Sequence, residues 1–339
     1  MKVIFMGTPD FAVGALDAIV EAGHEVVLVV TQEDKPKGRG KEIQFTPVKE
    51  AAIKHGIEVY QPHRVKHEEP VAKLREYNAD VFVVAAYGQI LSKELLDMPK
   101  YGCVNIHASL LPKYRGAAPI NWAVINGEKT TGVTTFMIDE GMDTGGIMYR
   151  YDCKIGPDET VGEVHDKLMA MGSELVVNTV EAIFENNVEF RPQKSFIQGS
   201  EILKPAPKLT RELCHIDWRS STKDIYNLIR GLSPYPAAFT ELVKGDKVTQ
   251  MKIYQTVKVE GEEYSEMLAQ CSMETAAPGA ILSDGKTFLA IATADGAISV
   301  TELQLAGKKR MPVKDFLIGF REPMTYTTTE GTSSNITGR

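Results

Sequence analysis

Three polar residues have the types and the spacing for acyl-transfer chemistry. Asn105 and His107 alternate within the apolar stretch 102–107, so in an extended strand their side chains lie on the same face. Asp143 follows in a connection rich in Asp and Gly. An amide N–H and an imidazole N–H can both donate to the oxygen that becomes negative when an acyl group is attacked. A carboxylate can orient the imidazole and accept the proton of an attacking amine. Together they predict transfer of an acyl group to an amine.

The same residues also allow simpler interpretations. Asn105 and His107 could be buried polar side chains that are satisfied by neighbouring backbone groups, as most buried polar groups are. Cys103 shares their face and is the candidate for a covalent nucleophile, but it lies deeper in the strand, and we expect a buried, inert thiol. One His and one Asp far apart in the sequence are too few ligands for a metal, so we expect no bound metal.

The stretch 109–119, SLLPKYRGAAP, favours a small-molecule site next to these residues. It is too apolar for a solvated turn, and Pro112, Gly116 and Pro119 keep it from forming a helix or a strand. An apolar loop beside converging polar groups is typical of a ligand site.

Residues 32–45, QEDKPKGRGKEIQF, form a basic stretch. Its positive side chains alternate with Pro and Gly: Lys35, Lys37, Arg39 and Lys41. This composition predicts a mobile loop without regular structure. The loop could be a solvated run of charge, or an arm that binds phosphates.

The elements that would position these residues alternate between strand and helix. The hydrophobic pattern predicts strands at 2–6, 25–31, 57–60, 80–86, 102–107, 132–138 and 146–154, and helices from about 11, from 46–47, and at 68–77, 119–126 and 160–185. This order predicts an α/β, Rossmann-like, doubly wound fold with a mainly parallel sheet. In such folds ligands bind at the carboxyl ends of the strands, where Asn105 and His107 lie.

The composition changes in the second half of the chain. We expect a catalytic domain over 1–189, a basic, Pro-containing linker over 190–208 that includes Lys204 and Lys208, and a disordered, Thr- and Ser-rich tail over 321–339. Between linker and tail, Asp-Gly turn signals separate short β-type runs and predict a smaller, mostly β, OB-like barrel over 209–320.

Composition limits the partners. The chain has 339 residues, 43% of them hydrophobic, and a formal net charge of −7. No apolar run approaches the roughly 20 residues that span a membrane, and the four cysteines are scattered. We expect a cytoplasmic monomer that does not bind membranes. Because the net charge is negative, any nucleic-acid contact must come from local basic patches.

The string from Asn105 to Ile147, NIHASLLPKYRGAAPINWAVINGEKTTGVTTFMIDEGMDTGGI, closely resembles the folate-dependent formyltransferases. The opening MKVIFMGTPDFAV, the loop KPKGRGK and the segment HIDW resemble the members of that family that act on methionine carried by initiator tRNA, over nearly the whole chain up to about residue 320. The resemblance implies formylation of initiator methionyl-tRNA for translation initiation, with 10-formyltetrahydrofolate as the donor.

The resemblance also implies roles for single residues. The family's catalytic residues fall on Asn105, His107 and Asp143. Its folate-contacting stretch falls on Ser109, Leu110, Leu111 and Pro112. Its tRNA-inserting loop falls on about 32–45, so that Lys35, Lys37, Arg39 and Lys41 would contact tRNA, together with Lys204 and Lys208 of the linker.

Two alternatives remain open at this point. One is a formyltransferase with the same catalytic domain that acts on a glycinamide nucleotide or an amino sugar nucleotide; the extra barrel disfavours the first and the basic loop the second. The other is a tRNA-binding module without activity, which would need neither the three polar residues nor the apolar loop. A formylation assay with each amine distinguishes all of these.

Overall fold

The computed structural model describes residues 1–37, 42–197, 199, 202–320 and 323–328. These form two compact units, which we describe separately. Unit 1 comprises Met1–Pro119, Thr130–Lys154 and His165–Ala206; unit 2 comprises Ile120–Lys129, Ile155–Val164 and the residues from Pro207 on. The predicted domain boundaries stay a prediction, because compactness does not show which residues fold or function independently.

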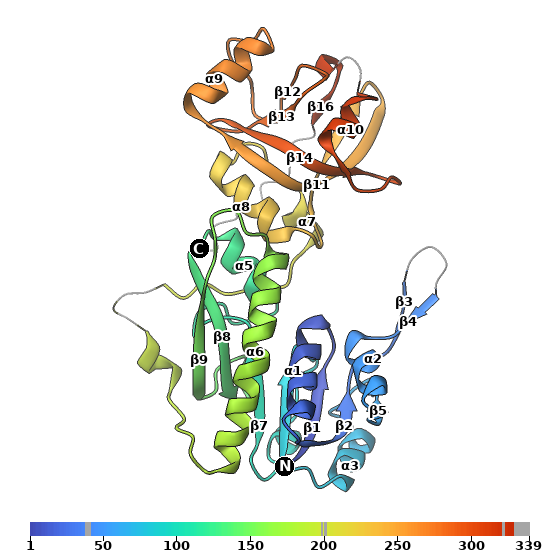
Figure 1. Cartoon of the computed structure of the whole chain (residues 1–339), viewed down its shortest axis with the longest axis vertical. Coiled ribbons are helices and arrows are strands. Elements are labelled where there is room, and N and C mark those ends of the chain that lie inside the picture. The colour runs from blue at the N-terminus through green and yellow to red at the C-terminus, as the bar shows by residue number, and fades with distance from the viewer. Residues whose placement is uncertain (38–41, 198, 200–201, 321–322, 329–339) are drawn as a thin grey trace. The chain divides into compact units, whose positions relative to one another are not determined.

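Unit 1 is built on a seven-stranded sheet with the order β5-β2-β1-β6-β7-β8-β9 (Figure 1). Its strands are β1 (Lys2–Gly7), β2 (Glu25–Val30), β5 (Val59–Tyr60), β6 (Val81–Ala85), β7 (Cys103–His107), β8 (Thr130–Met137) and β9 (Ile147–Lys154). The pairs from β5 to β7 are parallel, and β8 and β9 add antiparallel partners. The predicted α/β fold with a mainly parallel sheet is confirmed. The strand order reverses at β1 and β6, and ligands bind at such a point in folds of this kind.

Helices cover both faces of this sheet, which makes it doubly wound. They are α1 (Asp10–Glu21), α2 (Pro47–Lys54), α3 (Glu68–Glu76), α4 (Lys93–Leu96) and α6 (Val161–Phe184). On one face, Leu74 of α3 and Leu95 of α4 join a buried cluster with Ile4 of β1. On the other face, Gly172 of α6 lies so close to Ile106 that an added Cβ would stand 3.4 Å from it. Figure 1 shows α1 and α6 in front of the sheet.

Local signals set the helix starts as predicted. The Thr46 hydroxyl caps α2 by accepting a hydrogen bond from the Lys49 N–H at 3.1 Å, and Pro47 is the first helical residue. Before α6, the Glu163 carboxylate accepts from the Thr160 N–H at 2.8 Å, and the Thr160 hydroxyl lies 3.4 Å from the Glu163 N–H. This reciprocal capping box satisfies backbone donors that a helix start leaves without partners.

The prediction that residues 32–45 lack regular structure is wrong for residues 35–37 and 42–44, which form strands. Strands β3 (Lys35–Lys37) and β4 (Glu42–Gln44) pair antiparallel with each other in a sheet of their own. Pro36 has no N–H to donate, but an isolated hairpin has only edge strands, where Pro is tolerated.

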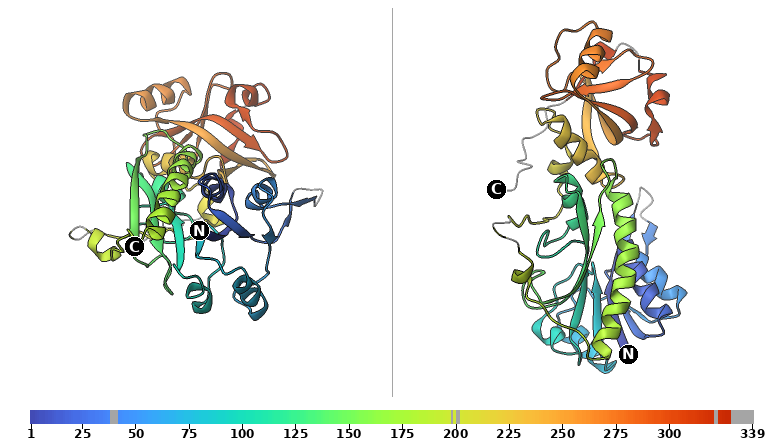
Figure 2. Two further views of the ribbon diagram at one scale, coloured as in Figure 1. Left: turned by 60° about the horizontal axis from the view of Figure 1, so that its bottom comes forward. Right: turned by 60° about the vertical axis from the view of Figure 1, so that its left-hand side comes forward.

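Unit 2 contains an antiparallel sheet with the order β12-β13-β14-β11-β10-β16, and β15 pairs with β14. Its strands are β10 (Ala238–Lys244), β11 (Lys247–Val259), β12 (Ile281–Ser283), β13 (Leu289–Ala292), β14 (Ala297–Leu305), β15 (Met311–Pro312) and β16 (Thr327–Thr328). The predicted turns at 244–246, 284–285 and 295–296 each join two antiparallel strands. Figure 2 shows how strongly these orange to red strands curve, which agrees with the predicted barrel.

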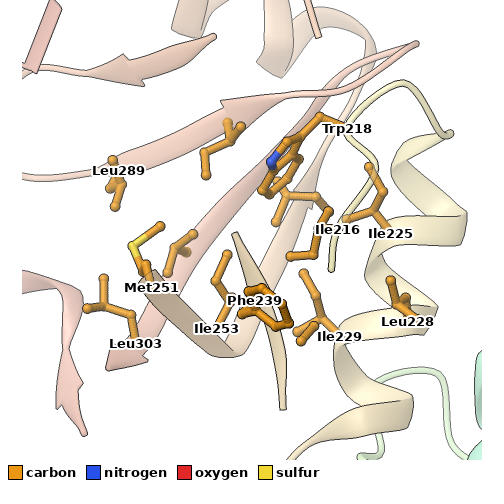
Figure 3. Close-up of a cluster of buried hydrophobic side chains, with 14 of the residues drawn as sticks. Ile216, Trp218, Ile225, Leu228, Ile229, Phe239, Met251, Ile253, Leu289 and Leu303 are labelled. Atoms are coloured by element: carbon orange, nitrogen blue, oxygen red, sulfur yellow. The ribbon is translucent and has the colours of Figure 1, made fainter. Parts of the chain in front are cut away.

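The core of unit 2 is a cluster of buried side chains from the strands of this sheet and from a neighbouring helix (Figure 3). Trp218 is 2% exposed and donates its indole N–H to the Thr240 hydroxyl at 3.1 Å. Ile225 and Ile229 of α8 (Thr222–Leu232) belong to the same buried cluster. The other helical segments that the structure describes are α5 (Pro119–Ile125), α7 (Arg211–Cys214), α9 (Gly261–Gln270), α10 (Val313–Leu317), η1 (Gln193–Phe196) and η2 (Pro323–Thr325).

Part of the predicted tail is ordered. Of residues 321–339, the structure describes 323–328, and β16 pairs there with Leu242 and Val243 of β10. For these residues the structure differs from the expected disorder, because the edge of β10 offers backbone partners to a strand-forming Thr pair. Within the described ranges, no helix is long and apolar enough to cross a membrane.

Candidate active site

Strand β7 carries the first two predicted site residues to the carboxyl end of the sheet. It pairs in parallel with β6 and antiparallel with β8, so its backbone is held on both sides. His107 is 6% exposed and Asn105 is half-buried. The two side chains lie on one face of the strand, as the alternation predicted.

His107 is held by two groups that come from different loops. Its Nε2 lies 2.8 Å from the backbone oxygen of Tyr114, and its Nδ1 lies 3.8 Å from Oδ2 of Asp143. A carbonyl oxygen can only accept a hydrogen bond, so Nε2 carries a proton. In the neutral ring this leaves Nδ1 unprotonated and facing the carboxylate.

The Tyr114 carbonyl reaches His107 because the backbone there adopts an unusual conformation. Tyr114 has φ +59°, in the left-handed region that large side chains avoid. Such a conformation costs about 1–3 kcal/mol and persists where the surrounding structure enforces it. Here the Tyr114 N–H donates to the Lys204 backbone oxygen at 2.9 Å, which holds the loop in place.

Asp143 also has a left-handed backbone, with φ +53°. Its Oδ2 accepts a hydrogen bond from the Gly116 N–H at 2.9 Å, in addition to its contact with His107. The neighbouring Asp139 stabilises the same connection by accepting from the Gly141 N–H and the Thr144 hydroxyl at 3.0 and 2.6 Å. The structure therefore brings His107 and Asp143 together from distant parts of the chain.

The predicted folate-contacting stretch is mostly buried. Ser109 and Leu111 are fully buried, Pro112 is buried, and Leu110 is partly exposed. The hydroxyl of Thr134 attaches the stretch to β8. It donates a hydrogen bond to the backbone oxygen of Ser109 at 2.6 Å and accepts one from the Leu111 N–H at 3.2 Å. Leu110 is therefore the member of this stretch with exposed surface to offer a ligand.

Cys103 is buried, as predicted. Its thiol lies 3.5 Å from the Leu95 backbone oxygen, and burial raises the pKa of the thiol far above its usual value. The nucleophilic thiolate is therefore scarce, and Cys103 is a structural residue. Among the residues that the structure describes, no cluster of three His, Cys, Asp or Glu side chains could hold a metal.

The predicted tRNA-binding residues are dispersed. Lys35 is exposed on β3, and Lys37 ends the same strand. Arg39 and Lys41 lie outside the described residues. Lys204 belongs to unit 1 and Lys208 to unit 2, and both are exposed.

A polar network that the sequence analysis missed anchors the β3–β4 hairpin. Lys49 of α2 forms an ion pair with Asp34 and donates to the Gln61 side chain at 2.8 Å. Gln61 in turn donates to the Gln32 backbone oxygen at 2.7 Å, and the Gln32 amide donates to the Tyr87 backbone oxygen at 3.0 Å. The hairpin base is thus tied to the residues that follow β6 at the carboxyl edge of the sheet.

Comparisons with known proteins identify relatives of this chain. Residues 1–180 match the formyl transferase family, and residues 208–321 match the C-terminal domain of formyl transferases. A methionyl-tRNA formyltransferase from Agathobacter rectalis is 50% identical over 94% of this chain and 96% of its own length. The chain belongs to the methionyl-tRNA formyltransferase family. A second member, from Bacteroides fragilis, is 46% identical over 94% of this chain and 95% of its own length.

Solved structures share the fold with this methionyl-tRNA formyltransferase family member at low sequence identity. The sugar 3N-formyl transferase WlaRD, crystallised with dTDP and 5-N-formyl-THF, has a TM-score of 0.60 and 19% identity over 91% of this chain and 99% of its own. HypX from Aquifex aeolicus, in complex with tetrahydrofolic acid, has a TM-score of 0.58 and 18% identity over 94% of this chain and 47% of its own. The family relationship makes the protein an enzyme, a formyltransferase.

Proposed function

We propose that this enzyme transfers the formyl group of 10-formyltetrahydrofolate to the free amino group of methionine on initiator methionyl-tRNA, for translation initiation in the cytoplasm. The family relationship supports both substrates. The observation that carries the chemistry is the contact of 3.8 Å between His107 Nδ1 and Asp143 Oδ2 at the end of β7. An imidazole beside a carboxylate is suited to an amine that must lose a proton as it attacks.

In the proposed reaction the methionine amine attacks the formyl carbon directly. The C–N bond forms while the carbonyl electrons move to oxygen, and the side-chain N–H of Asn105 donates to that oxyanion. Asp143 accepts the proton that the amine nitrogen loses as it attacks. The intermediate then collapses as the bond between the formyl carbon and the folate nitrogen breaks, and the folate nitrogen leaves with the proton that Asp143 had accepted. Since Nε2 of His107 donates to Tyr114, the ring can stabilise the oxyanion through Nδ1 only when it carries a second proton.

The remaining predicted site residues have supporting roles in this proposal. Leu110 contacts the pterin of the folate, and the buried Ser109, Leu111 and Pro112 hold Leu110 from behind. The basic residues of the loop contact the acceptor end of the tRNA, and those of the linker contact the rest: Lys35, Lys37, Arg39 and Lys41, then Lys204 and Lys208. The enzyme acts as a monomer, with functional domains at 1–189 and 209–320 joined by the linker.

One assay tests the proposal against its alternatives. The protein is incubated with 10-formyltetrahydrofolate and, separately, with initiator methionyl-tRNA, a glycinamide nucleotide and an amino sugar nucleotide. We expect formylation of the methionyl-tRNA. Formylation of one of the small amines alone would overturn the substrate assignment. Binding of tRNA without formylation of any amine would instead indicate a binding module.

A further inference from the structure

Gln193 lies outside the residues to which the resemblance assigns a role, but it makes several contacts beside Asp143. Gln193 is the first residue of η1 and is 4% exposed. Two residues earlier, the backbone of Arg191 exchanges two hydrogen bonds of 2.8 Å with Ile147 of β9. Both Arg191 and Gln193 belong to the stretch that the sequence predicted to be a linker. Here that stretch packs against the loop that carries Asp143.

The oxygen and the nitrogen of the Gln193 side-chain amide both form hydrogen bonds. Its Nε2 donates to the backbone oxygens of Asp143 and Gly145 at 2.7 and 3.0 Å. Its Oε1 accepts from Nε and Nη2 of Arg115 at 3.1 and 2.6 Å. The orientation of the amide is certain, because Arg can only donate and a carbonyl can only accept.

These contacts join the two loops that hold the Asp143 carboxylate. One loop carries Asp143 itself, whose left-handed backbone is strained and is fixed by the donation to its carbonyl. The other loop carries Arg115, and the next residue, Gly116, donates its N–H to the carboxylate. Gly145 cannot carry a side chain, since an added Cβ would stand 1.7 Å from the backbone oxygen of Met137.

We infer that Gln193 is a positioning residue for formyl transfer: its amide holds the Asp143 carboxylate beside His107, where in the proposed reaction it accepts the proton of the amine. The inference rests on the proposed function and adds a residue to it. Gln193 does not touch the reacting atoms and acts through Asp143. A side chain with one donor end and one acceptor end is required, because a carboxylate at this position would repel the two backbone oxygens.

The first test is the substitution Gln193→Glu, which keeps the shape and the acceptor for Arg115 but removes the donor. We expect kcat for methionyl-tRNA formylation to fall about tenfold to a hundredfold, the cost of a misplaced catalytic group. The KM values for folate and tRNA should change by less than about twofold, because neither substrate contacts Gln193 in the proposal. Asn227→Asp is the matched control: Asn227 is a buried amide of unit 2 that accepts from Arg230 at 2.8 Å, and we expect unchanged kcat.

The second test separates positioning from general loss of structure. In an Asp143→Asn background, Gln193→Glu should lower kcat hardly further, because the carboxylate that it positions is already gone. Amide hydrogen exchange gives a readout besides activity: Gly116 should lose protection in Gln193→Glu while the strands of unit 1 keep theirs.

Three outcomes are distinguishable. If the parent protein formylates no methionyl-tRNA, the proposed function fails. If the parent is active and Gln193→Glu retains the parent kcat, the inference is overturned. The inference would also be overturned if the loss of kcat in the double variant equalled the product of the losses in the two single variants. Unchanged hydrogen exchange of the Gly116 amide in Gln193→Glu would overturn it as well, because Gln193 would then act independently of Asp143.

Discussion

At the scale of single residues, the site is defined by backbone groups as much as by side chains. The Tyr114 carbonyl fixes the protonation of Nε2 in His107, and the Gly116 N–H holds the Asp143 carboxylate. His107 and Asp143 themselves are only 3.8 Å apart at their nearest ring and carboxylate atoms. A small change at either residue should therefore affect catalysis more than folding.

Asp143→Asn tests this view. The substitution keeps the acceptor for the Gly116 N–H but removes the charge that accepts a proton in the proposed reaction, so we expect kcat to fall by at least about a hundredfold. Steady-state kinetics with methionyl-tRNA measures this. Asp139→Asn is the control in the same loop, where an acceptor for Gly141 and Thr144 remains and we expect nearly normal kcat. Full activity of Asp143→Asn would reduce Asp143 to a turn-forming residue.

Tyr87 allows a prediction about stability. Within the described residues its hydroxyl is buried without a hydrogen-bond partner, and burial raises the pKa of the phenol. An unsatisfied buried hydroxyl is destabilising, so Tyr87→Phe should raise the free energy of unfolding by about 1 kcal/mol in urea titrations. Tyr226→Phe is the contrasting variant, because the Tyr226 hydroxyl donates to Asp158 at 2.7 Å and its loss should destabilise. A less stable Tyr87→Phe protein would contradict the prediction.

At the scale of elements, single carboxylates and caps set where helices and hairpins begin. Asp295, in the turn between β13 and β14, accepts from the Thr222 N–H at 2.7 Å and the Thr222 hydroxyl at 2.9 Å. Thr222 is the first residue of α8, where negative charge favours the helix. The contact joins the hairpin to the helix that carries part of the core of unit 2.

This contact makes stability depend on pH. The hydrogen bond from the Thr222 backbone lowers the pKa of the Asp295 carboxyl below its usual value. A lowered pKa in the folded state means that the stabilisation is complete above the unfolded pKa of about 3.9 and is lost as the pH falls below it. Asp295→Asn should lower the free energy of unfolding by about 1 kcal/mol at pH 7, with the difference shrinking toward pH 2. A difference that is the same at both pH values would rule out the charge as its cause.

At the scale of the whole molecule, charge must be local to attract a polyanion. The formal net charge is −7, so the proposed binding of tRNA requires local basic segments, and we propose 35–41 as one of them. The hairpin that carries this segment is anchored by Lys49 and Gln61 to the carboxyl side of the catalytic sheet. A loop that binds tRNA would therefore be attached to the sheet at a fixed position and would not move as a free segment.

Arg39→Ala tests whether the loop binds tRNA. If Arg39 contacts a phosphate, the apparent affinity for methionyl-tRNA should fall and the slope of its salt dependence should flatten by about 0.7–0.9 on a log–log scale. Formylation of a small methionine amine analogue should hardly change. Arg75→Ala is the matched control, because it removes the same charge from an exposed position on α3, where Arg75 pairs with Glu94 at 2.6 Å. Equal behaviour of the two variants at every salt concentration would assign tRNA binding to other residues.

The amino-acid sequence alone predicted much of the fold and the place of two candidate site residues on one strand. The strands of the seven-stranded sheet, the helix start at 46–47 and the hairpin turns of unit 2 were all predicted, because each depends on residues close together in the chain. The polar pair on β7 was predictable for the same reason, since alternation along a strand puts Asn105 and His107 on one face.

The contacts that connect the site could be found only in the tertiary structure. Gln193 is 50 residues from Asp143 and 78 from Arg115, and no local pattern marks a glutamine for that position. The partners of His107 and Asp143 include the backbone groups of Tyr114 and Gly116, which every residue has, so residue type does not reveal them. Even the pairing of β3 with β4 went against the composition of the loop. These features depend on which distant segments meet when the chain is packed, and packing is a property of the whole fold.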